Sequence, residues 1–193
     1  YAFTLDKTYL ANKAYPPMKS ACEFWIDRLV VDTDGKLVAP DEWSPEQGPW
    51  EKGVTYAQQL VWDLFTNTLK AIDVLNIDPT FKTTLQSKLN LLDPGLRVNG
   101  VGELREWKYS ANTVADGDVA EGGAHHRHIS HLIGLYPGNQ ISPSINTTFS
   151  NAVKVSLNNR GENMEGWGMA WRVNCRARLR DGDHALSILR KYA

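Results

Sequence analysis

The side chain best suited to act as a catalytic acid lies in the segment Ser44–Pro49 (SPEQGP). Within this segment Glu46 follows a proline and precedes a Gly-Pro turn, and Trp43 and Trp50 lie on either side. Apolar neighbours raise the pKa of a carboxyl group by desolvation, and a general acid that works near neutral pH needs a raised pKa. Glu46 is therefore a candidate general acid. The alternative is structural, because a proline followed by a glutamate is also typical of the first turn of a helix.

Glu103 and Glu106 are further candidates for carboxylate chemistry. Hydrolysis of a glycosidic bond needs one carboxylic acid that protonates the leaving oxygen and a base that acts from the opposite side. Both glutamates are equally compatible with the first turn of a helix. Asp116 and Asp118 surround a glycine and have the pattern of turn residues.

Four of the five histidines lie within seven residues, and three of them follow the pattern His125-x2-His128-x2-His131. Neutral imidazoles bind zinc well, so a zinc site is one interpretation. A helical metal site would favour a spacing of four residues, no cysteine is nearby, and the positive charge of Arg127 would oppose a dication. We therefore expect no metal ion and no cofactor.

A sugar-binding site is the interpretation that the same segment favours. Arg127 and His128 supply hydrogen-bond donors to sugar hydroxyls, and Trp107 or Trp167 could offer a flat surface to the apolar face of a sugar. The alternatives are surface or helix-capping histidines, and tryptophans that pack in the core. Trp167 and Trp171 are four residues apart, the spacing of one helix face, for which core packing is the usual reason. We expect the arginines that follow, at positions 172, 176, 178 and 180, on a solvated face or at the rim of a barrel.

The elements that must position these side chains are predicted to be helices. Apolar residues recur at spacings of three and four, and no convincing strand pattern is present. The predicted helices run from Pro16-Pro17 to about residue 29, from Gly53 to about 75, from Asp78-Pro79 to about 92, over about 146–158 and 166–180, and from near Asp183. The short connection near residue 77 makes the second and third of these antiparallel neighbours. The chain is thus assigned to the all-α class, with two long connections, 32–54 and 94–145, that carry the candidate site residues.

Composition excludes several classes of function. The 193 residues carry 21 basic and 22 acidic side chains, a net charge of −1, so there is no electrostatic case for binding nucleic acid or an anionic membrane. No apolar run approaches the roughly 18 residues typical of a membrane span. Cys22 and Cys175 lie among apolar residues and are predicted to be buried thiols. The chain begins at Tyr1 and stops within a helical pattern, so we expect residues 1–193 to be a piece of one larger domain.

Several segments together resemble the catalytic domain of glycoside hydrolase family 95, the inverting α-L-fucosidases that act mainly on α-1,2-linked fucose. The matching stretches are Ser44–Pro49, Gly102–Trp107 (GELREW), His126–Gly138 (HRHISHLIGLYPG), Gly166–Trp171 (GWGMAW) and Ala177–Ala185 (ARLRDGDHA). The long histidine stretch is the most specific of these. The resemblance implies a six-hairpin (α/α) barrel in which long loops at one end build the active site.

Carried over from the family, Glu46 resembles the general acid, and Arg127 and His128 resemble substrate-contacting residues. Glu106 is our second choice for the acid, since it also lies in a matching stretch. The family's water-activating residues, an asparagine pair upstream and an aspartate downstream, have no counterpart in these 193 residues. Inversion needs water activated on the face opposite the acid, so we expect the chain alone to be inactive.

The resemblance further implies a fucosylated oligosaccharide as substrate and an extracellular protein. The sequon at Asn146 is an acceptor for a glycan if the protein is secreted. Two alternatives stay open: an α-L-galactosidase of the same family, whose substrate differs by a hydroxyl at C6, and a non-catalytic helical module that binds glycans. A hydrophobic pocket rejects an added hydroxyl only weakly, so the sequence does not separate the two sugars.

Overall fold

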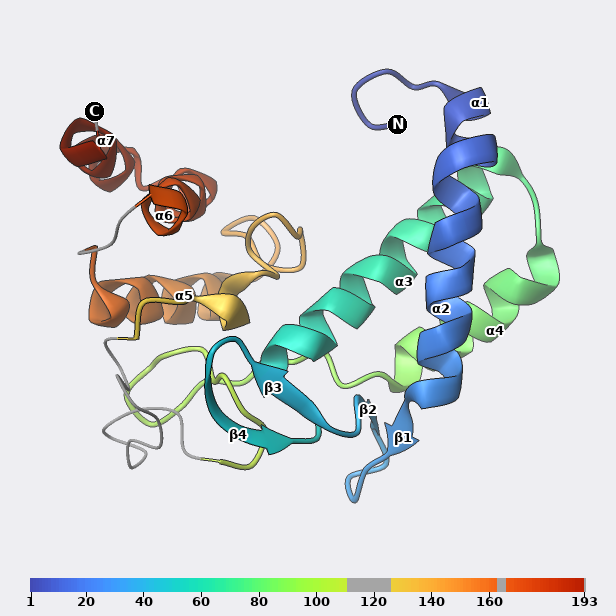
Figure 1. Ribbon diagram of the computed structural model, residues 1–193, viewed down its shortest axis with the longest axis horizontal. Coiled ribbons are helices and arrows are strands. Elements are labelled where there is room, and N and C mark those ends of the chain that lie inside the picture. Colours follow the sequence, from blue (N-terminus) through green and yellow to red (C-terminus); the bar gives the residue numbers. More distant parts are fainter. Residues whose placement is uncertain (111–125, 163–165, 193) are drawn as a thin grey trace.

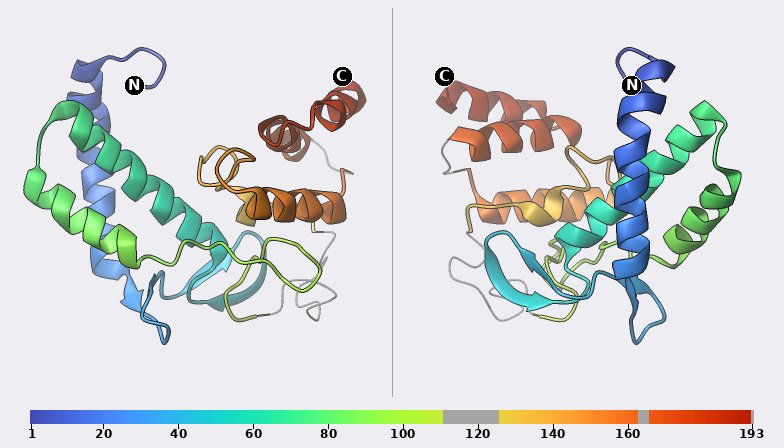
Figure 2. Two further views of the ribbon diagram at one scale, coloured as in Figure 1. Left: turned by 180° about the vertical axis from the view of Figure 1, so that it is seen from behind. Right: turned by 45° about the vertical axis from the view of Figure 1, so that its right-hand side comes forward.

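The computed structural model describes residues 1–110, 126–162 and 166–192, and it is mainly helical. Figure 1 shows three helices, α2 (Tyr15–Arg28), α3 (Thr55–Leu75) and α4 (Pro79–Leu91), packed together at one side. At the other side lie α5 (Thr147–Arg160), α6 (Gly166–Arg178) and α7 (Gly182–Tyr192), and two short β-hairpins lie below and between the two groups (Figure 2). The prediction of a mainly helical chain is confirmed. No helix in the described part of the chain has the length and apolar character that a membrane crossing requires.

The first helix is longer than its sequence pattern predicts. A short helix, α1 (Lys7–Tyr9), is followed by a π-helical segment, η1 (Leu10–Ala14), and then directly by α2, so that the three form one continuous rod. Asp6 caps the start of this rod, where its carboxylate accepts a hydrogen bond from the backbone N–H of Tyr9 at 2.9 Å. The two prolines at the start of α2 have no N–H, and the hydrogen-bond ladder switches to the wider π spacing just before them.

The three helices α2, α3 and α4 share one hydrophobic core. The connection between α3 and α4 is short, and Asn76 and Asp78 both adopt positive φ there, which reverses the chain and makes the two helices antiparallel neighbours, as predicted. Their buried side chains, together with residues of the adjoining segments, are Cys22, Leu29, Leu37, Val61, Phe65, Leu69, Leu85 and Leu92. Cys22 is a buried free thiol, as is Cys175 in α6, which confirms the prediction for both.

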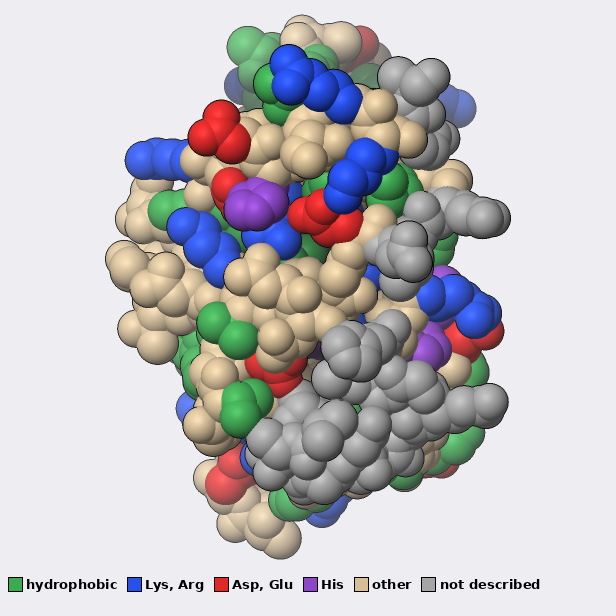
Figure 3. All heavy atoms as spheres, turned by 90° about the vertical axis from the view of Figure 1, so that its left-hand side faces the viewer, with side chains coloured by type: hydrophobic (Ala, Val, Ile, Leu, Met, Phe, Trp, Pro, Cys, Tyr) green, Lys and Arg blue, Asp and Glu red, His purple; other side chains and the backbone are tan. Residues whose placement is uncertain are grey.

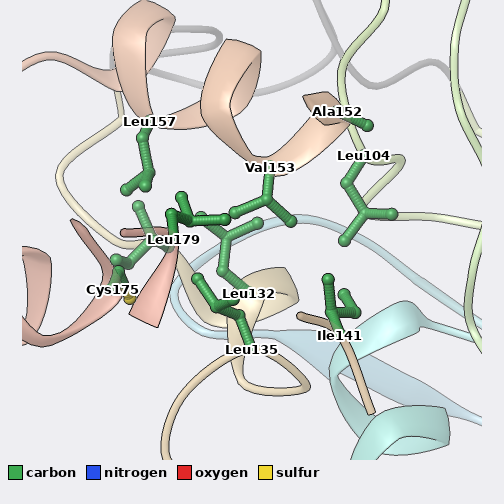
Figure 4. Packing of buried hydrophobic residues seen from close by; sticks show 10 residues of the cluster. Leu104, Leu132, Leu135, Ile141, Ala152, Val153, Leu157, Cys175 and Leu179 are labelled. Carbon is green, nitrogen blue, oxygen red and sulfur yellow. The ribbon is translucent and has the colours of Figure 1, made fainter. Parts of the chain in front are cut away.

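A second core joins α5 and α6 to the long connection before them. It contains Leu104, the short 3-10 helix η3 (Ser130–Leu132) and the segment up to Ile141, and Figure 4 shows leucine side chains from these parts meeting between the helices. The stretch 126–141 therefore has little regular structure of its own but is anchored by buried apolar side chains. This packing holds residues 126–131, the histidine segment, next to the N-terminal end of α6.

The two β-hairpins were not visible in the sequence. They are β1 (Val30–Val31) with β2 (Leu37–Val38), and β3 (Glu42–Ser44) with β4 (Gln47–Glu51), both antiparallel. Strands of two to five residues are too short to show an alternation of apolar and polar side chains. The second hairpin corrects the alternative in which Glu46 opens a helix, because Glu46 lies in the turn between β3 and β4.

Candidate active site

Glu46 stands at the tip of the β3–β4 hairpin, where its side chain is about half exposed, at 48%. Its Oε1 atom accepts a hydrogen bond from the guanidinium group of Arg127, and its Oε2 atom lies 3.1 Å from Nε2 of His128. These two partners follow Glu46 by 81 and 82 positions in the sequence. The fold thus brings together the three residues that the sequence analysis singled out for acid catalysis and sugar binding.

The electrostatics at Glu46 differ from the sequence-based expectation. The hydrogen bond with His128, and then the positive charge of Arg127, hold the pKa of this carboxyl below its usual range. The expected rise of this pKa, caused by enclosing tryptophans, is wrong, because Trp43 and Trp50 stack on each other with ring centroids 6.2 Å apart. Trp50 is exposed, and Trp43 donates its indole N–H to the carbonyl of Gly48 at 2.9 Å.

Two buried arginines hold the backbone on which Arg127 and His128 stand. Arg160 of α5 donates to the carbonyl oxygen of His128 at 2.9 Å, and Arg172 of α6 donates to that of Arg127 at 3.0 Å. Burial lowers the pKa of Arg172 to about 10, which leaves it charged near neutral pH. The expectation of a solvated face is therefore wrong for Arg172 and for the equally buried Arg176. Sequence reasoning missed Arg160 and Arg172 as site residues, because an arginine on a helix carries no signal of burial.

Trp167 lies beside this site at the start of α6. Its side chain is 65% exposed, its ring centroid is 5.9 Å from that of His128, and it stacks on Trp171 at 5.3 Å. A groove of about 470 Å³ continues from it, lined by Ile133, Tyr136, Pro137, Trp167, Ala170, Trp171 and Asn174. The core-packing interpretation is therefore wrong for Trp167, whose face is open to a ligand next to His128.

Trp107 has a different surrounding. Its side chain is fully buried, and its six-membered ring lies directly against Gly48 of the β3–β4 hairpin. A sugar cannot reach a ring covered in this way. The placement does not support the predicted sugar-binding role of Trp107 and assigns it to the support of the hairpin that carries Glu46.

Glu103 and Glu106 lie below the surface. Glu103 accepts hydrogen bonds from the side-chain amides of Asn99 and Asn159, at 3.0 and 2.6 Å. Glu106 is buried and pairs with Arg160 at 2.6 Å. Burial alone would raise the pKa of Glu106, but the positive charge of Arg160 and the hydrogen bonds from Ser44 and Arg160 outweigh burial and lower it. Glu106 is buried and already bound by Ser44, Gln47 and Arg160, so a substrate cannot reach it, and the half-exposed Glu46 is the better placed of the two candidate acids.

The histidine cluster is divided between different partners. His128 faces Glu46, whereas His131 is buried with its Nδ1 atom 3.7 Å from Glu106. His125, and the aspartates Asp116 and Asp118, lie outside the described residues. Among the residues that the structure does describe, no group of three or more histidine, cysteine, aspartate or glutamate side chains is arranged to hold a metal ion.

A second charged cluster lies at the ends of α6 and α7. Figure 3 shows acidic, basic and histidine side chains side by side on this face. Asp181 pairs with Arg176 at 3.1 Å and with His184 at 2.8 Å, and Lys191 pairs with Glu162 at 3.3 Å. The charged side chains of this cluster are thus already paired within the protein, whereas Glu46 stands half exposed beside Arg127 and His128.

Comparison with known proteins gives a consistent result along the whole chain. Residues 1–193 match the model of the glycosyl hydrolase family 95 catalytic domain. The chain is 36% identical to a probable alpha-fucosidase A of Aspergillus niger and 31% identical to alpha-L-fucosidase 2 of Arabidopsis thaliana, with 98% of the chain covered in each case. It is 35% identical to a probable alpha-fucosidase A of Aspergillus oryzae over 81% of the chain. The chain spans about a quarter of the length of these relatives, 25%, 22% and 22% respectively.

The contact between Gly48 and Trp107 leads to a prediction about stability. Gly48 has a φ of +76°, and a Cβ atom added there would lie 2.1 Å from the Trp107 ring. Gly48→Ala must therefore displace the hairpin or the ring, which we expect to lower the free energy of unfolding by about 1–3 kcal/mol beyond the cost of backbone strain. Chemical denaturation of the full-length protein measures this loss.

Gly35→Ala is the matched control for that substitution. Gly35 has nearly the same φ, +77°, but no atom lies within 4 Å of the added Cβ position. It should incur only the strain of the left-handed conformation, about 1–2 kcal/mol. Equal losses for the two variants would show that the Trp107 ring does not support the hairpin.

Proposed function

The chain belongs to glycosyl hydrolase family 95, and on that premise we propose that the full-length protein is an exo-acting, inverting α-L-fucosidase that hydrolyses α-1,2-linked fucose. The observation that carries the proposal is the placement of Glu46, Arg127 and His128, a half-exposed carboxylate with two hydrogen-bond donors from the histidine segment. The relatives named as alpha-fucosidases support the choice of sugar. The helical hairpins of this chain are proposed to form part of a six-hairpin (α/α) barrel, with residues 1–193 inside a single catalytic domain.

Glu46 is the proposed general acid. Its proton passes to the glycosidic oxygen as the bond between this oxygen and the anomeric carbon of fucose breaks, and the aglycone leaves as an alcohol. Water attacks the opposite face of the sugar, so that the configuration is inverted. The residues that activate this water are proposed to lie in other parts of the full-length protein.

Arg127 and His128 are proposed to bind the hydroxyls of the terminal sugar, with Trp167 beside them against its apolar face. In the free site their interactions keep Glu46 ionised, which is the wrong state for an acid. When sugar hydroxyls accept the hydrogen bonds of Arg127 and His128, the carboxylate loses its two stabilising partners. The pKa of Glu46 then rises, and the carboxyl group can carry the proton that catalysis needs.

Glu46→Gln in the full-length enzyme tests the assignment of the acid. We expect kcat for an α-1,2-fucosyl oligosaccharide to fall by about 10²–10⁴-fold, because general acid catalysis contributes that much. An aryl α-L-fucoside with an acidic phenol as leaving group needs little protonation and should lose much less. Release of L-fucose and of the phenol measures the two rates.

Glu42→Gln is the control for the same hairpin, since Glu42 pairs with Arg28 and lies outside the candidate site. It should retain activity on both substrates. Hydrolysis of the oligosaccharide by Glu46→Gln within a few-fold of wild type would show that Glu46 is not the acid. Absence of fucose release by the wild-type enzyme would contradict the fucosidase assignment itself.

The pH dependence supplies a separate test of how Glu46 is controlled. Activity requires the protonated acid and is lost as pH rises through its pKa. Because the pKa of Glu46 is lowered in the free site, the fall of kcat/KM, which reports the free enzyme, should lie at acidic pH, below the range in which an ordinary glutamate titrates. The fall of kcat, which reports the substrate complex, should lie at higher pH. Arg127→Ala removes a charge that lowers this pKa, so the fall of kcat/KM should move to higher pH. The proposed control of Glu46 would be contradicted if kcat and kcat/KM fell at the same pH in the wild type and the variant left the fall of kcat/KM unmoved.

An extracellular location is proposed from the sequon at Asn146. Asn146 caps the start of α5 through its Oδ1 atom, which accepts from the backbone N–H of Phe149 at 3.3 Å, whereas a glycan attaches to the Nδ2 atom. Secretion of the full-length protein from a eukaryotic host should give a glycan at Asn146, seen as a mass loss on enzymatic deglycosylation. Thr148→Ala should abolish this glycan without touching the cap, because Thr148 completes the sequon. An unmodified Asn146 in the secreted protein would contradict the proposal.

A further inference from the structure

The turn that contains Glu46 is held in place by the buried carboxylate of Glu106. The hydroxyl of Ser44 donates to Oε1 of Glu106, and the side-chain amide of Gln47 donates to Oε2 at 3.0 Å. Ser44 is the last residue of β3 and Gln47 the first of β4, so these two hydrogen bonds flank the turn on both sides. One buried carboxylate thereby fixes both ends of the segment in which Glu46 lies.

The same carboxylate is connected to the histidine segment through Arg160. One terminal nitrogen of this arginine lies 2.6 Å from Oε2 of Glu106, and the other donates to the carbonyl oxygen of His128 at 2.9 Å. A direct contact runs parallel to this bridge, because the hydroxyl of Ser130 donates to the carbonyl oxygen of Pro45. The tip of the β3–β4 hairpin and the backbone of His128 are therefore both hydrogen-bonded to the ion pair of Glu106 and Arg160.

Burial leaves the two charges of this ion pair dependent on each other. The side chains of Glu106 and Arg160 are only 2% and 4% exposed, so each needs the other as its counter-charge. His131 lies 3.7 Å from Glu106, but burial lowers the pKa of His131 to about 4, so this imidazole is neutral near neutral pH. Among the described residues Arg160 is consequently the cation that balances Glu106, and a shift of either side chain would move the hairpin and the histidine segment together.

We propose that Glu106 is a positioning residue, which holds the Glu46 hairpin and, through Arg160, the backbone of His128 in one mutual arrangement. The inference rests on the proposed function for its catalytic consequence, because Glu46 is taken as the acid there. The positional link itself depends only on the contacts of Ser44, Gln47 and Arg160. The two parts can therefore be tested separately.

The catalytic consequence is measured in the full-length enzyme with Glu106→Gln on the two classes of fucoside. A misplacement of a catalytic group by about 1 Å costs on the order of 10²-fold in rate. We therefore expect kcat for the fucosyl oligosaccharide to fall by about 10–100-fold. The fold-loss of kcat for the activated aryl fucoside should be smaller by a factor of about five or more. A loss of folded enzyme would lower both rates by the same factor, and equal losses would overturn the proposal.

Glu103→Gln is the matched control, because Glu103 is also buried, lies three residues earlier and is bound by asparagines outside the hairpin. It should change both rates by one common factor. If Glu106→Gln does not fold, Ser44→Ala takes its place, since it removes one hydrogen bond to Glu106 and leaves the ion pair with Arg160 intact. The same dependence on the leaving group is then expected, with a smaller magnitude, and its absence would overturn the proposal.

The positional link is tested without any reference to activity by hydrogen–deuterium exchange of the full-length protein. Glu106→Gln should raise exchange in both segments 42–51 and 126–131, and Glu103→Gln in neither. Ser44→Ala should raise it in 42–51. A rise that Glu103→Gln shares, or no rise in either segment, would overturn the link. If the wild-type enzyme releases no fucose, the proposed function fails, and the exchange pattern still decides whether Glu106 positions the two segments.

Discussion

Arg160 reaches the carboxylate of Glu106 through one terminal nitrogen and the backbone carbonyl of His128 through the other, and both side chains are buried. Breaking such a pair leaves an uncompensated buried charge, so the two side chains tolerate few alternative positions. The turn that carries Glu46 and the segment that carries His128 lie outside regular secondary structure. Their relative position depends on this ion pair and on the hydrogen bonds that attach each segment to it.

The surrounding hydrophobic packing serves the same arrangement. Trp107 follows Glu106 directly in sequence, and its buried ring packs against Gly48 of the β3–β4 hairpin. Leu132 follows the histidine segment and lies in the core shared with α5 and α6, from which Arg160 and Arg172 extend. Apolar burial thus supplies the rigid frame, and the buried charges select one geometry within it. This division is common where a site lies on loops, because loops alone cannot hold side chains to the accuracy that catalysis needs.

The two hydrogen-bond partners of Glu46, Arg127 and His128, give the proposed enzyme a way to link protonation to substrate binding. A carboxylate that is half exposed and hydrogen-bonded to Arg127 and His128 is stable as an anion. Sugar hydroxyls that accept those hydrogen bonds remove this stabilisation where and when the proton is needed. Desolvation by the bound sugar acts in the same direction, because it disfavours the charged form. In this scheme the acid is prepared by the substrate and not by the apolar neighbours that the sequence suggests.

The helices, the approximate ends of all but the first, and the buried thiols follow from the sequence alone, because apolar spacing, proline and capping residues act over a few positions along the chain. The histidine segment and Glu46 are also identifiable from residue types and their context. Only the tertiary structure decides that Trp107 is buried while Trp167 is exposed, that Arg160 and Arg172 point inward, and that the pKa of Glu46 is lowered. The physical reason is that burial and charge neighbours depend on contacts between segments far apart in the sequence, such as Glu106 with Arg160 at 54 positions and Glu46 with His128 at 82. The local pattern of residue types along the sequence does not predict such contacts.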